Sequence, residues 1–329
     1  MPSHSGTDLT FNNALEKIKS FLINSSALWE CVADTLPSAP EYSATAFQCG
    51  STTLAGTTAR TIYLKCTSYD GLSECYFALY NKNSASSYFN IEVRGIDQYV
   101  EGRDIDYSFG GIPYAGDIAR LPLNGNTASI YHITGDERKV YLLVMAGTRP
   151  QTFGFGMFLQ SGTPEEYPKP MFVGGSLSAS TTHVNSATAS NGNKAFFSPS
   201  DTLHIFTPYS TWISFDNYGT DDTITNTVIT TGFYTMPYLA GWANDNAMDA
   251  RCWGNEQLAM FPIWIWACQV NSRPDVYGEL DGVMYVGGDS ETPIVAGDTV
   301  TANGKTYVIW RHPLLSDGNS YAAFEMIGA

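Results

Sequence analysis

Residues whose side chains could perform chemistry are few, and their spacing forms no known catalytic motif. Histidine is the commonest general base in enzymes, and the chain has five well-separated histidines: His4, His132, His183, His204 and His312. The sequence contains no Gly-x-Ser-x-Gly elbow, no His-Glu-x-x-His zinc motif, no phosphate loop and no dinucleotide fingerprint. We therefore predict no catalytic, cofactor-binding or metal-binding residues, and we interpret His204 as a core residue of a strand.

Two acidic segments loosely resemble loops that bind divalent cations. They are Asp104-x-Asp106 and Asp216–Asp222. Neither has the helix-flanked spacing of a calcium loop, so we interpret both as turns whose carboxylates accept local backbone hydrogen bonds. A glycosidase would need two acidic residues in a cleft, and a chain with 32 acidic residues supplies such pairs without identifying any of them.

The cysteines are even in number but scattered through a long chain: Cys31, Cys49, Cys66, Cys75, Cys252 and Cys268. This distribution is typical of reduced, mostly buried thiols, which we predict for all six. Cys66 and Cys75 could face each other across a hairpin. Their spacing is neither Cys-x-x-Cys nor a zinc pattern, so no structural metal is expected there.

The chain is rich in aromatic residues and poor in charge. Aromatic residues make up 13% of it, with 20 tyrosines and 7 tryptophans, whereas charged residues make up 15%. Two interpretations remain open. Aromatic residues are enriched and charges are depleted in the cores of protein interfaces, and aromatic residues also favour β-strands.

The net charge of −15 is unevenly distributed along the chain. Residues 1–170 hold 12 lysines and arginines against 17 acidic residues, whereas residues 171–329 hold 5 against 15. Binding to nucleic-acid phosphates needs a basic surface, so direct nucleic-acid contact is not expected. Met1–Thr10 is polar and the apolar runs are short, so we expect neither a signal peptide nor membrane insertion.

One helix is predicted near the start of the chain, and almost everything after it is predicted to be strand. Helical spacing is shown by four apolar residues: Phe11, Leu15, Ile18 and Leu22. Asn13 followed by Glu16 is typical of a capping box, in which each residue satisfies a backbone N–H of the other.

The remaining pattern predicts short antiparallel strands. Twelve segments are rich in aromatic and β-branched residues: Arg60–Lys65, Tyr76–Tyr80, Tyr88–Arg94, Ser129–Ile133, Lys139–Ala146, Phe153–Leu159, Thr202–Phe206, Thr211–Phe215, Leu258–Ala267, Val283–Val286, Thr306–Arg311 and Tyr321–Ile327. Asp-Gly, Asn-Gly and Gly-Gly turn signals separate them, at 70–71, 124–125, 174–175, 281–282, 303–304 and 317–318. We predict an α+β fold, mostly antiparallel β, with the helix packed on a sheet and a β-rich carboxyl-terminal part.

The segment Tyr167-Pro168-Lys169-Pro170 is predicted to be a stiff connector, because each proline fixes its own φ and favours an extended residue before it. We place a domain boundary there. Residues 1–168 form the helix-and-sheet domain, and residues 169–329 form a β-rich, tryptophan-rich, acidic domain. Gly174 and Gly175 follow the connector, and the polar stretch Ser176–Asn193 is interpreted as a loop or an extended arm.

The most apolar segment is Met260–Trp266, which contains Phe261, Pro262, Trp264 and Trp266. Pro262 cannot donate a ladder hydrogen bond, which confines this strand to an edge, a strand start or a bulge. A bare apolar edge would invite uncontrolled association. Either the protein's own core or a neighbouring subunit must therefore cover these four residues, which we regard as a possible interface.

Several segments resemble a family of tailed-bacteriophage virion proteins. Glu166–Ser176, reading EYPKPMFVGGS, is similar to that family's YPxPhhhGGS segment, which also follows a strand comparable to Lys139–Ala146. Leu15–Phe21 and Thr61–Lys65 lie where the family carries a helix and an apolar strand. Near the carboxyl end, residues 278–286 and 304–310 resemble its terminal hairpins.

The resemblance spans most of the chain in the right order, but two stretches depart from it. Asp289–Pro293 is more polar than the family's pattern, and Leu177–Ala267 matches nothing in it. The resemblance implies a structural role in the virion, in the tail or baseplate, and it implies no catalytic residues. Tyr167, Pro168, Pro170, Gly174 and Gly175 are then expected to set the geometry of the protein.

We therefore expect a non-enzymatic virion component that is made in the host cytoplasm and assembles into a ring or another symmetric complex with other virion proteins. The tryptophan-rich carboxyl half leaves two alternatives open: a module that binds host glycans or receptors, and a capsid decoration protein. An enzyme such as a depolymerase is the remaining alternative. No cofactor is expected.

Overall fold

The computed structural model describes residues 3–34, 60–85, 88–96, 99, 119–123, 127–176, 196, 203–210, 212–214, 232–236, 259–268, 275–287, 295–311 and 320–327. Within them the chain forms one helix and three antiparallel sheets, so the predicted fold class is confirmed. Both acidic segments considered as cation loops, and residues 177–193 of the predicted arm, lie outside the described residues.

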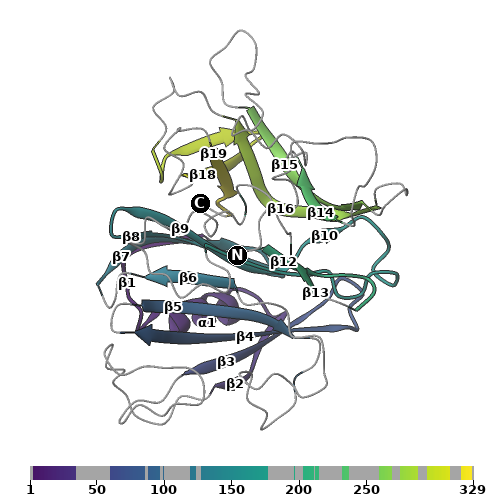
Figure 1. Cartoon of the computed structure of the whole chain (residues 1–329), viewed down its shortest axis with the longest axis horizontal. Coiled ribbons are helices and arrows are strands. Elements are labelled where there is room, and N and C mark those ends of the chain that lie inside the picture. The colour runs from purple at the N-terminus through teal and green to yellow at the C-terminus, as the bar shows by residue number, and fades with distance from the viewer. Residues whose placement is uncertain are drawn as a thin grey trace.

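The three sheets are stacked, with the central one between the other two (Figure 1). The amino-terminal sheet contains, in spatial order, β2 (Trp29–Asp34), β3 (Thr61–Thr67), β4 (Glu74–Ala85), β5 (Tyr88–Ile96) and β6 (Ala119–Leu123). The central sheet contains β1 (His4–Leu9), β7 (Ser129–Gly135), β8 (Lys139–Ala146), β9 (Arg149–Met157), β11 (Met171–Gly175), β12 (Leu203–Phe206) and β13 (Trp212–Ser214).

The carboxyl-terminal sheet contains, in spatial order, β14 (Gly232–Met236), β15 (Ala259–Cys268), β16 (Asp275–Gly287), β19 (Ser320–Glu325), β18 (Lys305–Arg311) and β17 (Thr299–Ala302). The two-residue strand β10 (Leu159–Gln160) also belongs to it, because it pairs with β16. Strand β10, which follows β9 directly, therefore belongs to the carboxyl-terminal sheet, whereas the other strands of that sheet begin only at β14.

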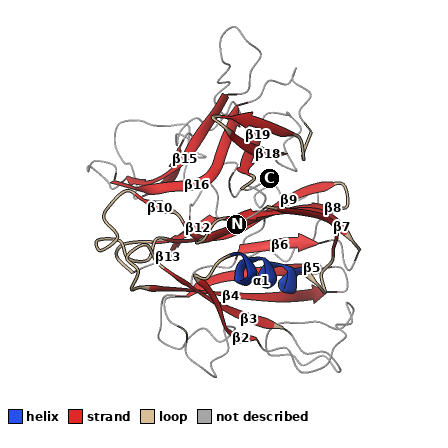
Figure 2. Cartoon of the chain, turned by 180° about the vertical axis from the view of Figure 1, so that it is seen from behind, coloured by secondary structure: helices blue, strands red, loops and turns tan. Residues whose placement is uncertain are grey.

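Helix α1 (Ala14–Ser25) lies against the amino-terminal sheet (Figure 2), as the apolar spacing predicts. Asn13 is its N-cap residue, but the predicted capping box is wrong. The Asn13 side chain accepts a hydrogen bond from the backbone N–H of Thr10, which precedes the helix. Glu16 instead pairs with the guanidinium of Arg60 at 2.6 Å. An ion pair with a buried arginine therefore replaces the local cap.

Two apolar clusters hold the layers together. The first lies between the amino-terminal and central sheets and includes Phe77, Phe155 and the inward side of α1. The second lies between the central and carboxyl-terminal sheets and includes Tyr141, Phe172 and Trp310. Burial of apolar area contributes roughly 25 cal/mol per Å², so these two interlayer cores stabilise the stacking of the three sheets.

The strand predictions are confirmed for all twelve segments, and Lys139–Ala146 has the observed bounds of β8. Strands β1, β2, β6, β11, β14 and β17 were missed, and one predicted segment, Phe153–Leu159, ran from β9 into the first residue of β10. Asn303 and Gly304 both have positive φ and join β17 to β18, as the Asn-Gly signal predicts. The predicted turns at Gly174–Gly175 and Asp281–Gly282 are wrong, because the first pair lies inside β11 and the second inside β16.

The predicted boundary near residue 168 lies between two strands of one sheet. Strand β11 follows it and pairs with β9, which precedes it, over five residues from Met171 to Gly175. The hydrogen-bonded central sheet therefore runs across this boundary. The carboxyl-terminal sheet takes strand β10 from before this boundary and its other strands, β14 to β19, from after it.

Candidate functional site

The segment from Tyr167 to Pro170 contacts all three sheets. The hydroxyl of Ser68, just after β3 of the amino-terminal sheet, donates a 2.5 Å hydrogen bond to the carbonyl of Pro168. Directly after β9 of the central sheet, the backbone N–H of Phe158 donates to the carbonyl of Pro170 at 2.9 Å. We call Tyr167–Pro170 the connector segment. The carbonyls of both prolines in this segment therefore accept hydrogen bonds from residues outside it, Ser68 and Phe158.

Tyr167 extends this contact to the third sheet. It is buried, its hydroxyl donates a hydrogen bond to the carbonyl of Phe206 in β12, and its ring meets Tyr277 of β16 edge-on with centroids 6.1 Å apart. Burial, followed by the nearby Tyr277, raises the pKa of Tyr167 well above its ordinary value of 10.0. The hydroxyl therefore stays protonated and acts as a permanent donor.

Gly174 and Gly175 lie in β11 and bring other elements close to the central sheet. A Cβ on Gly175 would lie 2.6 Å or less from backbone atoms of Arg120 in β6. A Cβ on Gly174 would lie 2.8 Å from the ring of Phe196. Any side chain at residue 175 would therefore force β6 away from β11, so this glycine permits the close approach of two sheets.

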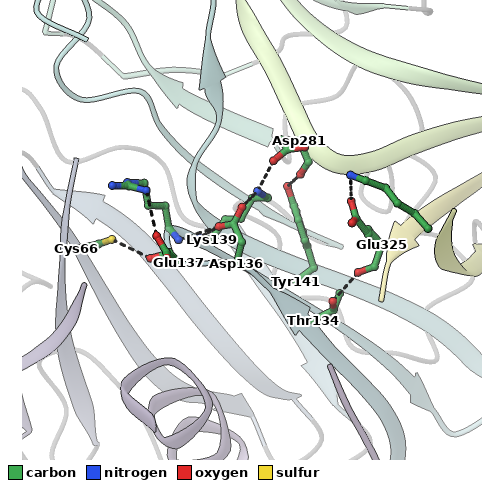
Figure 3. Close-up of polar contacts among 10 residues, drawn as sticks. Cys66, Thr134, Asp136, Glu137, Lys139, Tyr141, Asp281 and Glu325 are labelled. Carbon is green, nitrogen blue, oxygen red and sulfur yellow. Dashed lines mark hydrogen bonds and ion pairs between the residues drawn. The ribbon is translucent and has the colours of Figure 1, made fainter. Parts of the chain in front are cut away.

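A buried lysine joins the central sheet to the carboxyl-terminal sheet (Figure 3). Lys139, at the start of β8, reaches Asp281 of β16 at 2.8 Å and also pairs with Asp136 in the turn before β8. Its side chain is 2% exposed. A lone buried ammonium would be costly, whereas two carboxylate partners satisfy it.

The backbone of β16 is kinked at this contact. Gly282 has φ +77°, and the hydroxyl of Tyr141 donates to the carbonyl of Asp281 at 3.1 Å. Burial alone would raise the pKa of Asp281, but the charge and the hydrogen bond of Lys139, with smaller contributions from Lys305 and the backbone N–H of Gly282, together outweigh it. The pKa therefore lies below the ordinary value of 3.8. Asp281 therefore stays ionised and paired under neutral conditions.

A second polar contact lies beside the first (Figure 3). The hydroxyl of Thr134 in β7 donates to the carbonyl of Glu325 in β19 at 2.5 Å. The carboxylate of Glu325 pairs with Lys305 of β18 at 2.8 Å, where the lysine is half exposed. Together with Lys139 and Tyr141, these contacts fix the position of the carboxyl-terminal sheet on the central one.

Cys66 and Cys75 lie directly opposite each other in the β3–β4 ladder, so the prediction that they face each other is confirmed. Both are buried. Burial, with a smaller effect from Cys75, raises the pKa of the Cys66 thiol, which donates to the carbonyl of Glu137. A thiol with a raised pKa is a poor nucleophile and a poor metal ligand.

The four predicted interface residues do not share one face. Strand β15 is not an edge, because β14 and β16 pair with it on either side, and Pro262 lies at an irregularity in the β15–β16 register. Phe261 packs toward the central sheet, whereas Trp264 is 40% exposed on the opposite face. For Trp266 the structure describes the backbone, which pairs with Val276.

The polar side chains described above bind other groups of this same chain. In the described part of the chain no three histidine, cysteine, aspartate or glutamate side chains lie where they could share a metal ion. None of the described helices is long and apolar enough to cross a membrane. The sequence analysis did not predict the pair of Lys139 and Asp281. Two features could have indicated it: a lysine begins the otherwise apolar strand β8, and an Asp-Gly pair interrupts the apolar pattern of strand β16.

Comparison with known proteins adds no assignment. No protein-family model matches the chain, and no curated protein matches it at a significant level.

Proposed function

We propose that this protein is a non-enzymatic structural component of a tailed-phage virion, acting in tail or baseplate assembly as part of a symmetric oligomer. The observation that carries the proposal is the connector segment. Its sequence resembles the corresponding segment of virion proteins, and in this fold Tyr167 and Pro168 meet neighbours from all three sheets.

The physical reasoning concerns rigidity. A subunit of a ring must present its two contact surfaces at a constant angle, because an angular error in each copy accumulates around the ring. The buried Lys139–Asp281 pair and the Thr134–Glu325 hydrogen bond hold two layers at a defined orientation. The connector segment binds the third layer, the amino-terminal sheet, through the hydrogen bond from Ser68 to Pro168. Such interlayer contacts support a role in geometry and leave none of these groups free for catalysis.

The proposal is tested on purified particles. Mass spectrometry of gradient-purified virions should detect this chain at a constant copy number per particle, and an antibody against it should label the tail or baseplate in negative-stain images. Labelling on the capsid surface would instead indicate a decoration protein. Absence of the chain from intact particles would refute the structural role.

A further inference from the structure

We infer that the outer face of the carboxyl-terminal sheet carries a docking surface for a basic, partly apolar segment of another protein. The outer face is the one turned away from the central sheet, and the surface consists of Trp264, Glu279, Leu159 and Val276. We call it the tryptophan row. The inference deepens the proposed assembly role by naming the kind of partner, and it is tested independently of that role.

The row is built by strand register. Trp264 of β15 lies opposite Glu279 of β16, and Glu279 lies opposite Leu159 of β10. Residues directly opposite each other in antiparallel strands project from the same face, about 5 Å apart. Their neighbours Ile263 and Ile265 are buried in the core toward the central sheet, so the row projects outward.

The row is apolar and solvent-exposed. Trp264 is 40% exposed, Leu159 48% and Val276 47%. The strand β10 is held in place at its end, because the backbone N–H of Ser161 donates to the carbonyl of Tyr277 at 2.9 Å. A rigid tryptophan flanked by aliphatic side chains is the composition of an interface hot spot, where little entropy is lost on binding.

The charge around the row favours a cationic partner. Glu279 lies within the row and has no ion-pair partner among the residues that the structure describes. Of the nearby lysines, Lys305 pairs with Glu325 and Lys139 with Asp281. Burial, followed by the charge of Asp281, raises the pKa of Glu279. A cation placed against Glu279 would be attracted by its carboxylate.

Two other occupants fit less well. Sugars need several hydrogen-bonding side chains beside a stacking ring, whereas Leu159 and Val276 flank Trp264 with aliphatic groups. In a twofold contact between two copies, the same patch meets itself. Glu279 would then face the same carboxylate of the second copy, and this like-charge contact disfavours the dimer.

The test uses the full chain and a defined probe, a fluorescein-labelled peptide of alternating lysine and leucine, with a serine–leucine peptide for comparison. Binding is followed by fluorescence anisotropy. We expect Trp264→Ala and Leu159→Ser to weaken binding of the lysine–leucine peptide about tenfold. Glu279→Gln should weaken it about fivefold, and Glu279→Lys should shift the preference to an aspartate–leucine peptide.

Matched controls come from exposed residues elsewhere. Leu72→Ser replaces a leucine that is 87% exposed, and Glu137→Gln replaces an exposed glutamate outside the row; neither should change the affinity. Thermal melting checks that each variant is folded.

Several results would overturn the inference. They are equal binding by all variants, equal binding of the serine–leucine peptide, and no binding of the lysine–leucine peptide below about 1 mM. Glycan binding lost in Trp264→Ala, or a dimer in sedimentation that this variant abolishes, would identify a different occupant. None of these results bears on whether the chain is present in virions, so the proposed assembly role would stand or fall separately.

Discussion

At the residue scale, several buried polar groups of this protein connect layers or fix the connector segment. Lys139 is nearly inaccessible, yet it has a carboxylate partner in its own sheet and another in the next one. Tyr167 and Thr134 donate their hydroxyl protons to carbonyls of other strands. Leaving such a group without its partner costs its full desolvation penalty. The contacts of Lys139 and Thr134 therefore specify one relative position of two sheets, and that of Tyr167 fixes the connector segment on the central sheet.

The first prediction concerns Lys139. Lys139→Met keeps the apolar stem but leaves Asp281 and Asp136 without their cation, and it should lower the free energy of unfolding by about 2–3 kcal/mol. Lys305→Met is the matched control, because Lys305 is half exposed and its pair should contribute less than about 1 kcal/mol. Urea unfolding measures both. Equal effects of the two substitutions would contradict the interlayer role of Lys139.

The second prediction concerns pH, because two nearby carboxylates are shifted in opposite directions. The pKa of Asp281 is lowered from 3.8, so its stabilising effect is complete above that pH and is lost as the pH falls through the folded-state value. The pKa of Glu279 is raised from 4.5, so its ionisation opposes folding as the pH rises through that region.

Asp281→Asn should therefore destabilise the protein at pH 7, and the deficit should shrink as the pH falls below 3.8. Glu279→Gln should be neutral or stabilising at pH 7, with its benefit disappearing below pH 4.5. Urea unfolding from pH 3 to pH 7 distinguishes the two profiles. If the change in unfolding free energy varied with pH in the same way for both variants, the pKa values of Asp281 and Glu279 would not be shifted in opposite directions.

At the scale of elements, the connector segment and the glycines of β11 determine how closely the sheets approach. The carbonyl of Pro168 is held by Ser68, and Gly175 lies against the backbone of β6. Both features depend on contacts between residues far apart in the sequence. The restricted φ angles of the two prolines would not by themselves position the sheets. The contacts with Ser68 and with the backbone of β6 are also needed.

The third prediction concerns the two prolines. Replacing Pro168 and Pro170 with glycine restores backbone freedom to the unfolded chain and should cost about 1–2 kcal/mol in total. Cleavage near residue 168 in limited proteolysis should become faster, and particle assembly should fail while each sheet remains folded. Normal assembly with unchanged protease resistance would show that the connector has no geometric role.

The fourth prediction concerns Gly175. Gly175→Ala places a Cβ within 2.6 Å of the Arg120 backbone, so it should destabilise the protein by about 2 kcal/mol through overpacking. Gly162→Ala is the control, because its nearest contact is the flexible end of Glu166 at 3.5 Å. Thermal melting measures both. A tolerated alanine at 175 would mean that β6 can move away freely.

Much of the fold follows from local patterns, because alternation and turn residues determine strands over a few neighbouring positions. Helix α1, strand β8 and the Asn303-Gly304 turn were predicted in this way. The capping box failed because Arg60, distant in sequence, attracts Glu16. The Gly174–Gly175 turn failed because close approach, rather than chain reversal, requires glycine at 175. Lys139 and Asp281 lie 142 residues apart, and no local pattern reveals such a pair.

At the scale of the whole molecule, three layers form two continuous interlayer cores, with polar contacts across one of them and the connector segment touching all three layers. The tryptophan row lies on the outer face of the third layer. The assembly role that we propose has two requirements, a fixed geometry within the subunit and a surface for a partner. The interlayer contacts would meet the first, and the tryptophan row would meet the second.

The most direct measurement of the central claim is a cryo-electron microscopy reconstruction of the tailed particle in which this chain is located. The account predicts copies arranged symmetrically about the tail axis, each with its three sheets in the mutual orientation described above and with Lys139 and Asp281 in contact. A particle that lacks the chain, or that contains copies whose sheets differ in mutual orientation, would contradict it.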